Sequence, residues 1–215
     1  MTDWLDFYRQ RLDRRKAADQ ALRHGWPSRQ GQEVRFAQVI RSLQALADRV
    51  DISAATIFDF GCGTGELFQR MDALGIGRHY IGVDGLQENI DDARVRTAGL
   101  SSKVDLYRFY WDDLAPLPFS DPIDISVENG AFATIPKVQR AVIFQSLLKI
   151  TRRAFIGTFY DPAHPTIEAS YGLFSATMPE VIDLIDREAF DYDITTGYVI
   201  EDFTLSLYRV NEVTR

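Results

Sequence analysis

Hydrophobic residues are grouped along this chain in two alternating patterns. Short strand-like runs occur at five places: Thr56 to Phe60, His79 to Asp84, Asp105 to Tyr110, Ile123 to Glu128 and Ala154 to Tyr160. Stretches with apolar residues at helical spacing follow three of these runs, at Glu66 to Leu74, Gln87 to Ala98 and Lys137 to Ile150. This alternation of strand and helix predicts parallel βαβ units in an α/β protein.

The two ends of the chain extend this pattern. After the fifth run we expect a helix around Pro179 to Glu188, and then two strands, Tyr192 to Ile200 and Thr204 to Asn211, that pair as an antiparallel hairpin. Near the N-terminus, one helix is indicated by Trp4, Leu5, Tyr8 and Leu12, and a second, with Ser28 as its N-cap, by Phe36, Val39, Ile40, Leu43, Leu46 and Val50. We interpret residues 1–50 as a helical lid on the core of residues 51–215, within a single domain.

Composition narrows the function classes. The 215 residues are 46% hydrophobic and 26% charged, with a net charge of −7, which disfavours a nucleic-acid partner. The single cysteine excludes an intramolecular disulfide, and no histidine and acid cluster has metal-ligand spacing. No apolar run approaches the ~20 residues of a membrane span, and the acidic N-terminus is unlike a secretory signal. We therefore expect a cytoplasmic protein with no membrane partner.

A glycine-rich turn follows the first strand. Residues 59–65 read Asp-Phe-Gly-Cys-Gly-Thr-Gly and lead directly into a predicted helix. Glycine lets the backbone turn at positive φ and lets a ligand lie against the main chain, while the helix N-terminus offers free N–H groups. The third glycine comes one residue earlier than in a dinucleotide-binding turn, and Asp59 would repel phosphate. The turn therefore favours a zwitterionic ligand with a cationic amino group.

In its order of an acid, any residue and Gly-x-Gly-x-Gly, this turn resembles motif I of the class I S-adenosylmethionine-dependent methyltransferases. The resemblance extends from about Ala54 to the C-terminus. It implies a Rossmann-like, doubly wound and mostly parallel seven-stranded sheet, whose last strand inserts antiparallel beside the fifth. It also implies S-adenosylmethionine as the cofactor, with Gly61, Gly63 and Gly65 near its methionine part and ribose. Asp59 would order the loop or face the amino group, and Cys62 would fill space.

The next two strand ends supply the expected nucleoside site. Asp84 ends the second strand a little over twenty residues beyond the turn, where a carboxylate accepts hydrogen bonds from both ribose hydroxyls. Gly85 and Leu86 would then pass beside the adenine. By the same resemblance, Asp112 accepts a hydrogen bond from the adenine amine and Trp111 covers the purine face, although Asp113 is an alternative acceptor.

The fourth strand ends in Glu128-Asn129-Gly130, where amino-methylating enzymes of nucleic acids carry an Asn/Asp-Pro-Pro-aromatic signature. This difference lowers the case for a nucleic-acid or protein-glutamine substrate. Glu128 and Asn129 are candidate catalytic residues at the reactive centre. Glu128 either faces the cofactor or serves as a general base, or it caps the following helix.

Histidine and arginine supply the remaining candidates. His164 is the best placed histidine base, ahead of His24 and His79, although a surface role is the alternative for each. Arg35 lies one helical turn from Gln32, so that both can face the site, and its guanidinium would pair with the methionine carboxylate unless it is a surface residue.

We therefore predict an S-adenosylmethionine-dependent methyltransferase that transfers a methyl group in line to an O, N or C nucleophile of a small molecule. One alternative is a non-catalytic methyltransferase-like module that binds a partner. A second is a nicotinamide-dependent oxidoreductase, which the glycine spacing and Asp59 oppose. The sequence carries no code for the identity of the acceptor or for an oligomeric state.

Overall fold

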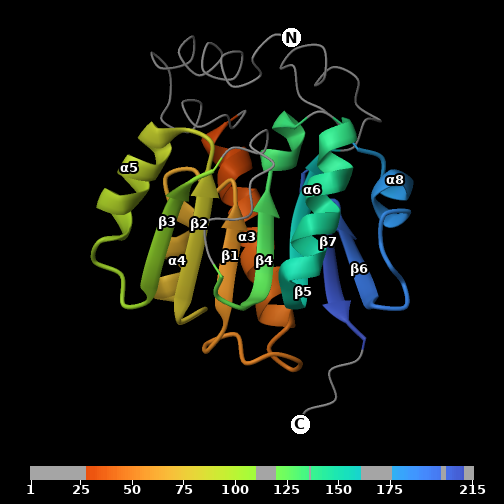
Figure 1. Ribbon diagram of the computed structural model, residues 1–215, viewed down its shortest axis with the longest axis horizontal. Coiled ribbons are helices and arrows are strands. Elements are labelled where there is room, and N and C mark those ends of the chain that lie inside the picture. The colour runs from red at the N-terminus through yellow and green to blue at the C-terminus, as the bar shows by residue number, and fades with distance from the viewer. Residues whose placement is uncertain (1–27, 110–119, 136, 161–175, 200–201, 211–215) are drawn as a thin grey trace.

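A computed structural model describes residues 28–109, 120–135, 137–160, 176–199 and 202–210. Within them lies one seven-stranded sheet, drawn in Figure 1. Its strands are β1 (Thr56–Phe60), β2 (His79–Asp84), β3 (Lys103–Arg108), β4 (Ile123–Asn129), β5 (Thr151–Tyr160), β6 (Phe190–Thr196) and β7 (Asp202–Arg209). The α-helices are α3 (Arg29–Ala45), α4 (Glu66–Ala73), α5 (Gln87–Thr97), α6 (Lys137–Ile150) and α8 (Met178–Ile182), and a 3-10 turn, η2 (Ala131–Thr134), follows β4.

The strand order is β3-β2-β1-β4-β5-β7-β6. Strands β1 to β5 are parallel, and β7 lies antiparallel between β5 and β6. The predicted mixed sheet with its antiparallel C-terminal hairpin is thus confirmed. From β1 the chain builds the sheet outward through β2 and β3, and then returns to the other side of β1 with β4. Ligands of open α/β sheets bind outside the carboxyl ends of the strands at such a reversal.

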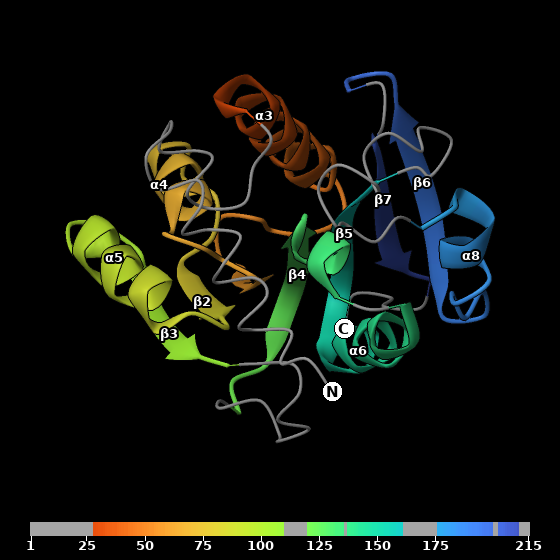
Figure 2. The same cartoon turned by 90° about the horizontal axis from the view of Figure 1, so that it is seen from above.

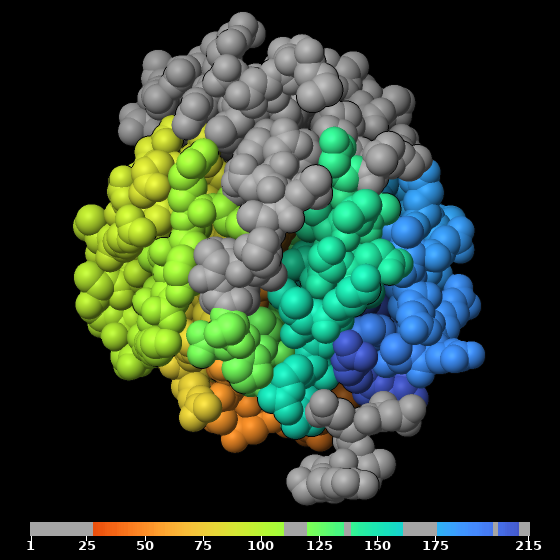
Figure 3. Space-filling model, in the orientation of Figure 1, coloured from red at the N-terminus to blue at the C-terminus, as the bar shows by residue number. Residues whose placement is uncertain are grey.

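Helices cover both faces of the sheet, as Figure 2 shows from above. Helices α3, α4 and α5 pack on one face, where Val39, Phe68 and Ile90 join a single apolar cluster with β1, β2 and β4. The opposite face carries α6 and α8 over a second cluster rich in phenylalanine. Figure 3 looks onto this second face, with α6 in teal and α8 in blue. We refer to the two sides as the α3 face and the α6 face.

Most predicted elements agree closely with the structure. The bounds of β1, β2 and α6 match the sequence prediction, while β3 lies about two residues earlier and β5 begins three residues earlier, at Thr151. The helix expected up to Glu188 is much shorter. Thr177 and Glu180 form a capping box that starts α8 at Met178, but the helix ends at Ile182 and tighter turns follow.

Helix α3 begins as predicted. The Ser28 hydroxyl accepts a hydrogen bond from the Gly31 amide at 3.0 Å, so Ser28 is the N-cap. The helix packs on β4, β5 and β7 through Phe36, Val39 and Leu43, all buried. This part of the expected lid therefore belongs to a layer of the core, and residues 1–27 lie outside the described ones. Among the helices described, none is long and apolar enough to cross a membrane.

Candidate functional site

The glycine turn joins the carboxyl end of β1 to α4. Gly61, Gly63 and Gly65 have φ values of 84°, 53° and 75°, a region that other residues rarely adopt. A side chain at Gly61 would place its Cβ 2.4 Å from the Cβ of Ala131, which follows β4. A Cβ at Gly63 meets no described atom within 4 Å. Gly61 is therefore required for packing between two strand ends, whereas Gly63 leaves the backbone open to a ligand.

Asp84 ties the turn to the next strand and helix. Its Oδ2 accepts a hydrogen bond from the Gly63 amide at 3.1 Å. Its Oδ1 accepts hydrogen bonds from the Leu86 amide at 2.9 Å and from Nδ2 of Asn89 at 3.1 Å. Leu86 is buried just before α5, and the Gly85 carbonyl accepts from Nε of Arg108. The predicted residues 84–86 thus lie together beside the glycine turn.

Sequence reasoning missed Asn89. Its side chain is buried in the first turn of α5 and holds the Asp84 carboxylate. The sequence feature that could have identified it is an asparagine five residues beyond the acid that ends β2. In contrast, Cys62 lies where it was expected, within the apolar cluster of the α3 face, and its Sγ would be 2.8 Å from a Cβ on Gly82. Burial, with Asp84 and Asp59 nearby, raises the pKa of this thiol well above its usual value.

Two buried acids at the site have raised pKa values. Burial and, to a smaller extent, the charge of Asp84 raise the pKa of Asp59 to about 7. Burial also raises the pKa of Glu128 to about 8, against the opposing effects of the Phe132 amide and Arg140. Because Asp59 and Asp84 stand at the ends of two adjacent strands, a cation bound beside them would stabilise the ionised form of Asp59.

Glu128 lies on the α6 face and makes the capping contact that was one of its predicted roles. It is fully buried, and its Oε1 accepts a hydrogen bond from the Phe132 amide at 2.8 Å, in the turn η2. Its Oε2 has no hydrogen-bond partner among the described residues. Glu128 therefore caps the turn with one oxygen and leaves the other oxygen buried and unpaired.

Asn129 lies on the opposite side of the sheet. Side chains alternate along a strand, so Asn129 points to the α3 face, as do Val127 and Ile125 before it. Asn129 pairs in register with Thr158 of β5, so the two side chains are neighbours on one face. Asn129 is 8% exposed, and neither the oxygen nor the nitrogen of its side-chain amide has a partner among the described residues.

Arg35 makes a different ion pair from the one expected. Its Nη2 lies 3.0 Å from Oδ1 of Asp202, and its Nε contacts Oδ2 of the same carboxylate. The guanidinium also lies 4.9 Å from the centre of the Tyr160 ring. The fork that was expected to face a methionine carboxylate is thus directed at β7, because α3 crosses β4, β5 and β7 and its inner side points there. Arg35 is 2% exposed, so it is not a surface residue either.

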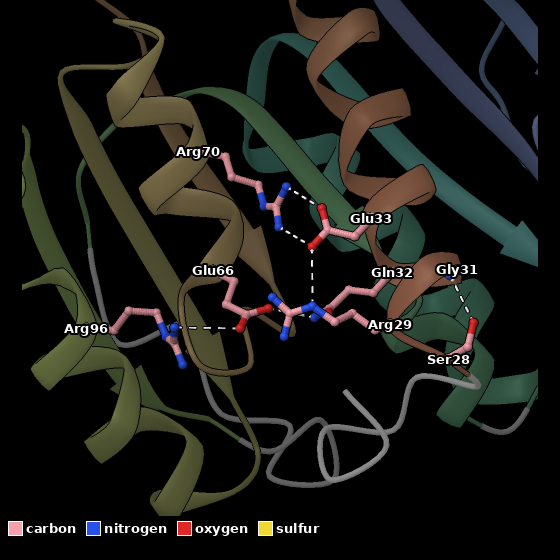
Figure 4. Close-up of polar contacts among 8 residues, drawn as sticks. All are labelled: Ser28, Arg29, Gly31, Gln32, Glu33, Glu66, Arg70 and Arg96. Atoms are coloured by element: carbon pink, nitrogen blue, oxygen red, sulfur yellow. Dashed lines mark hydrogen bonds and ion pairs between the residues drawn. The ribbon is translucent and has the colours of Figure 1, made fainter. Parts of the chain in front are cut away.

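Gln32 points toward the glycine turn instead. Figure 4 shows its Nε2 donating to Oε2 of Glu66, the first residue of α4, at 2.8 Å. Arg96 of α5 reaches the other oxygen of Glu66 at 3.6 Å. Beside them, Arg70 and Glu33 form a paired contact with two N to O distances of 2.7 Å. These contacts join α3, α4 and α5 around the start of α4.

The remaining candidates lie either outside the described residues or at the amino edge of the sheet. Trp111, Asp112, Asp113, His164 and His24 lie outside the described residues. His79 begins β2 at the amino edge of the sheet, where its Nε2 lies 2.7 Å from Asp105, so it stands at the opposite edge from the glycine turn. The described chain contains no group of three or more potential metal ligands.

A separate cavity of about 290 Å³ lies on the α6 face, between α6, β5 and α8. Its walls are mostly apolar, including Phe144, Phe159 and Val181. Arg140 also lines it and is electrostatically coupled to Glu128. The cavity is therefore on the other side of the sheet from Asp59 and Asn129.

Residues 57–154, from β1 to the start of β5, match the family model described as Methyltransferase domain. By this match, residues 57–154 carry a methyltransferase domain. The motif on which the resemblance was based, residues 59–65, lies inside the matched segment of this domain. No curated protein matches the chain in sequence.

Solved structures share the fold of this methyltransferase domain over nearly its whole length. The magnesium protoporphyrin IX methyltransferase of Synechocystis PCC 6803, with bound SAH, is 13% identical, with a TM-score of 0.68 over 96% of this chain and 97% of that one. The N-methyltransferase NodS of Bradyrhizobium japonicum WM9, with S-adenosyl-L-homocysteine, is 14% identical, with a TM-score of 0.70 over 94% and 98%. The small RNA methyltransferase HEN1 is 17% identical, with a TM-score of 0.61, over 83% of this chain but 26% of its own.

Proposed function

We infer that this chain binds S-adenosylmethionine at the carboxyl ends of β1, β2 and β4 and transfers its methyl group to a small molecule. The observation that carries this inference is the open backbone at Gly63, flanked by the carboxylates of Asp59 and Asp84. Bare main chain suits a flat nucleoside, and the acids suit a cationic amino group. Two structural neighbours with the same fold carry the demethylated cofactor in their crystals.

Each acid has a distinct task in this proposal. Asp84, whose carboxylate is held beside the Gly63 backbone by hydrogen bonds from Gly63, Leu86 and Asn89, is the acceptor for the ribose hydroxyls. Asp59 is the partner for the ammonium group, because a nearby cation favours its ionised form. The glycines of the turn approach the cofactor, and the bound cofactor supplies the electrophilic methyl group. This chain contributes positioning and the exclusion of water.

A small-molecule acceptor is supported by the acidic character of the chain and of the site. A net charge of −7 repels a phosphate backbone, and two of the structural neighbours are a magnesium protoporphyrin IX methyltransferase and the N-methyltransferase NodS. The neighbour HEN1 acts on small RNA, so RNA is the competing acceptor. Methyl transfer from radiolabelled S-adenosylmethionine separates the two. We expect label in the low-molecular-weight fraction of a cell extract and none in purified RNA.

Calorimetry with S-adenosylhomocysteine tests the cofactor site directly. We expect saturable binding to the wild type and at least a tenfold loss of affinity in Gly63→Ala. Gly75→Ala is the matched control, because Gly75 also has a positive φ of 67° and no described atom within 4 Å of an added Cβ, but it lies at the end of α4. Both variants carry the same kind of backbone strain, so they should differ only in their affinity for S-adenosylhomocysteine. A folded wild type that gives no heat at high micromolar ligand overturns the proposal.

Two rival functions have their own readouts. Quenching of nicotinamide fluorescence by the protein would support an oxidoreductase. Tight binding of the cofactor with no methyl transfer to any fraction of the extract would support a non-catalytic binding module.

A further inference from the structure

A carboxylate stands at the start of the helix that follows the glycine turn. Glu66 is the first residue of α4, and Gly65 before it is the N-cap, which supplies no side-chain hydrogen bond to the first turn. The first N–H groups of a helix lack partners within the helix, and the helix dipole makes this end positive. Nucleotide-binding folds bind phosphate at such a helix start. In this chain the position already carries a negative charge.

Two neighbouring helices hold this carboxylate, as Figure 4 shows. Its Oε2 accepts a hydrogen bond from Nε2 of Gln32 on α3 at 2.8 Å, and its Oε1 lies 3.6 Å from Nη1 of Arg96 on α5. The side chain of Glu66 is 16% exposed, so solvent and salt screen its charge only in part. Movement of the carboxylate away from the helix start would break both contacts.

Arg96 keeps hydrogen-bonding capacity beside this ion pair. Its Nε is buried and has no hydrogen-bond partner among the described residues. Its contact with Glu66, at 3.6 Å, is longer than a hydrogen bond. A guanidinium carries five N–H donors in a geometry that matches phosphate. Without Glu66, Arg96 would therefore offer a phosphate ligand next to the positive end of α4.

The glycine turn directs part of a bound nucleoside toward these residues. In the proposed cofactor site the ribose meets Asp84, and the group on its 5′ carbon follows the turn, where the backbone of Gly63 is open. Gly65 packs against α5, since an added Cβ would lie 3.0 Å from Thr97, the neighbour of Arg96 in the chain. The 5′ group is also the part in which S-adenosylmethionine differs from phosphorylated adenosines. This part therefore passes the start of α4.

We propose that Glu66 is a specificity-determining residue that excludes phosphorylated nucleotides from the cofactor site. Its carboxylate offsets the positive N-terminus of α4 and the guanidinium of Arg96, and it repels a phosphate on the 5′ carbon. The zwitterionic amino-acid group of S-adenosylmethionine has no net charge and meets less repulsion. This role rests on the proposed methyltransferase function and is separate from that of Asp59, the partner of the ammonium group.

Affinities for ADP and adenosine test this role, because the two ligands differ only in the diphosphate. By calorimetry without added metal ions, we expect ADP to bind the wild type about tenfold more weakly than adenosine, and Glu66→Gln to raise the ratio of ADP to adenosine affinity at least about fivefold. The gain should shrink in high salt. A distorted turn would change both affinities together, so the ratio reports charge and not shape.

Glu33→Gln is the matched control for net charge. Glu33 follows Gln32 on α3 and pairs with Arg70 at 2.7 Å, so its replacement removes the same charge away from the start of α4. We expect an unchanged ratio in this variant. Addition of Arg96→Gln to Glu66→Gln should return the ratio most of the way to the wild-type value, because the phosphate then loses its guanidinium. Thermal unfolding of each variant checks that it is folded, and Glu66→Ser should give the same rise as Glu66→Gln.

Three outcomes overturn the proposal in a protein that binds S-adenosylhomocysteine. They are an unchanged ratio in folded Glu66→Gln and Glu66→Ser, an equal rise in Glu33→Gln, and a gain that persists in full in the double variant. A wild type that binds ADP as tightly as adenosine overturns it as well. Failure of the proposed function is a different result, in which the wild type binds neither S-adenosylhomocysteine nor adenosine, and the role of Glu66 then fails with it.

Discussion

The two faces of the sheet differ most at its carboxyl edge. On the α6 face, the rings of Phe132, Phe144, Phe155, Phe159 and Phe203 are all buried and contact one another with centroid distances between 5.2 and 6.3 Å. On the α3 face, the corresponding level holds Asp59, Asn129, Thr158 and the Arg35 to Asp202 ion pair. Apart from Glu128, the α6 face gains stability at this edge by burying apolar area, whereas the α3 face buries charged and amide groups.

This difference separates the residues that hold the fold from those that shape a site. Aromatic pairs contribute beyond their buried area, and none of them requires a ligand. The buried acids and Asn129 are costly unless something polar binds beside them. The contrast therefore predicts that substitutions of the aromatic residues on the α6 face reduce stability and leave cofactor affinity intact, whereas substitutions of the polar groups beside the turn reduce cofactor affinity.

The largest loss of stability is expected from Phe155→Ala. Phe155 is fully buried and meets the edge of Phe144 at 5.2 Å, so its truncation leaves a cavity in the phenylalanine cluster. We expect a loss of about 3–5 kcal/mol of unfolding free energy, measured by denaturant titration. The folded fraction should bind S-adenosylhomocysteine as the wild type does. A specific loss of affinity at full folding would contradict the division between the two faces.

Breaking the buried ion pair should rank next. Arg35→Met leaves the Asp202 carboxylate buried without its partner, and we expect a loss of about 3 kcal/mol. The double variant Arg35→Met with Asp202→Leu should recover most of this loss, because two apolar groups replace both charges. If the double variant is no more stable than Arg35→Met, the lost ion pair does not account for the loss of stability.

Gly61→Ala should cost about 2–3 kcal/mol. The substitution combines a strained positive φ with a contact at 2.4 Å to Ala131, whereas Gly63→Ala carries the strain alone and should cost about 1 kcal/mol. Denaturant titration of both variants checks this ordering. Equal losses would mean that the contact between the turn and β4 relaxes at no cost.

The pH dependence of stability probes the buried acids. The pKa of Asp59 rises from its usual value near 4 to about 7 on folding, so the folded state binds the proton more tightly than the unfolded state. The stability due to this proton is complete below about pH 4 and is lost as the pH rises to about 7. Asp59→Asn should therefore flatten the fall of unfolding free energy with pH over this interval. An unchanged slope would show that Asp59 ionises normally.

Local patterns were sufficient to predict where β1, β2, β4 and β5 end to within one residue. The run that ends in Asp84 is mostly apolar, the run that ends in Asn129 alternates apolar and polar residues, and the glycine turn is marked by three glycines at alternate positions. The contacts of Arg35 could not be read in this way. Its partner Asp202 is 167 residues away, and only the direction in which α3 crosses the sheet brings the two together. The lack of a hydrogen-bond partner for Asn129 among the described residues likewise depends on which side chains the neighbouring strands place beside it.

The smallest effect is expected at the surface contacts between α3 and α4. Glu33 is a partly exposed residue that pairs with Arg70 at 2.7 Å, and Arg70 lies 5.1 Å from the centre of the Phe36 ring. Exposed ion pairs contribute about 0–1 kcal/mol, so Glu33→Gln should change the unfolding free energy by no more than this.

Glu66→Gln nearby should differ, because Glu66 accepts a hydrogen bond from Gln32 and starts the helix that follows the glycine turn. We expect Glu66→Gln to bind S-adenosylhomocysteine several-fold more weakly than the wild type, and Glu33→Gln to bind it with unchanged affinity, as measured by calorimetry. Equal affinities would mean that these contacts only attach α3 to the domain and do not position the turn.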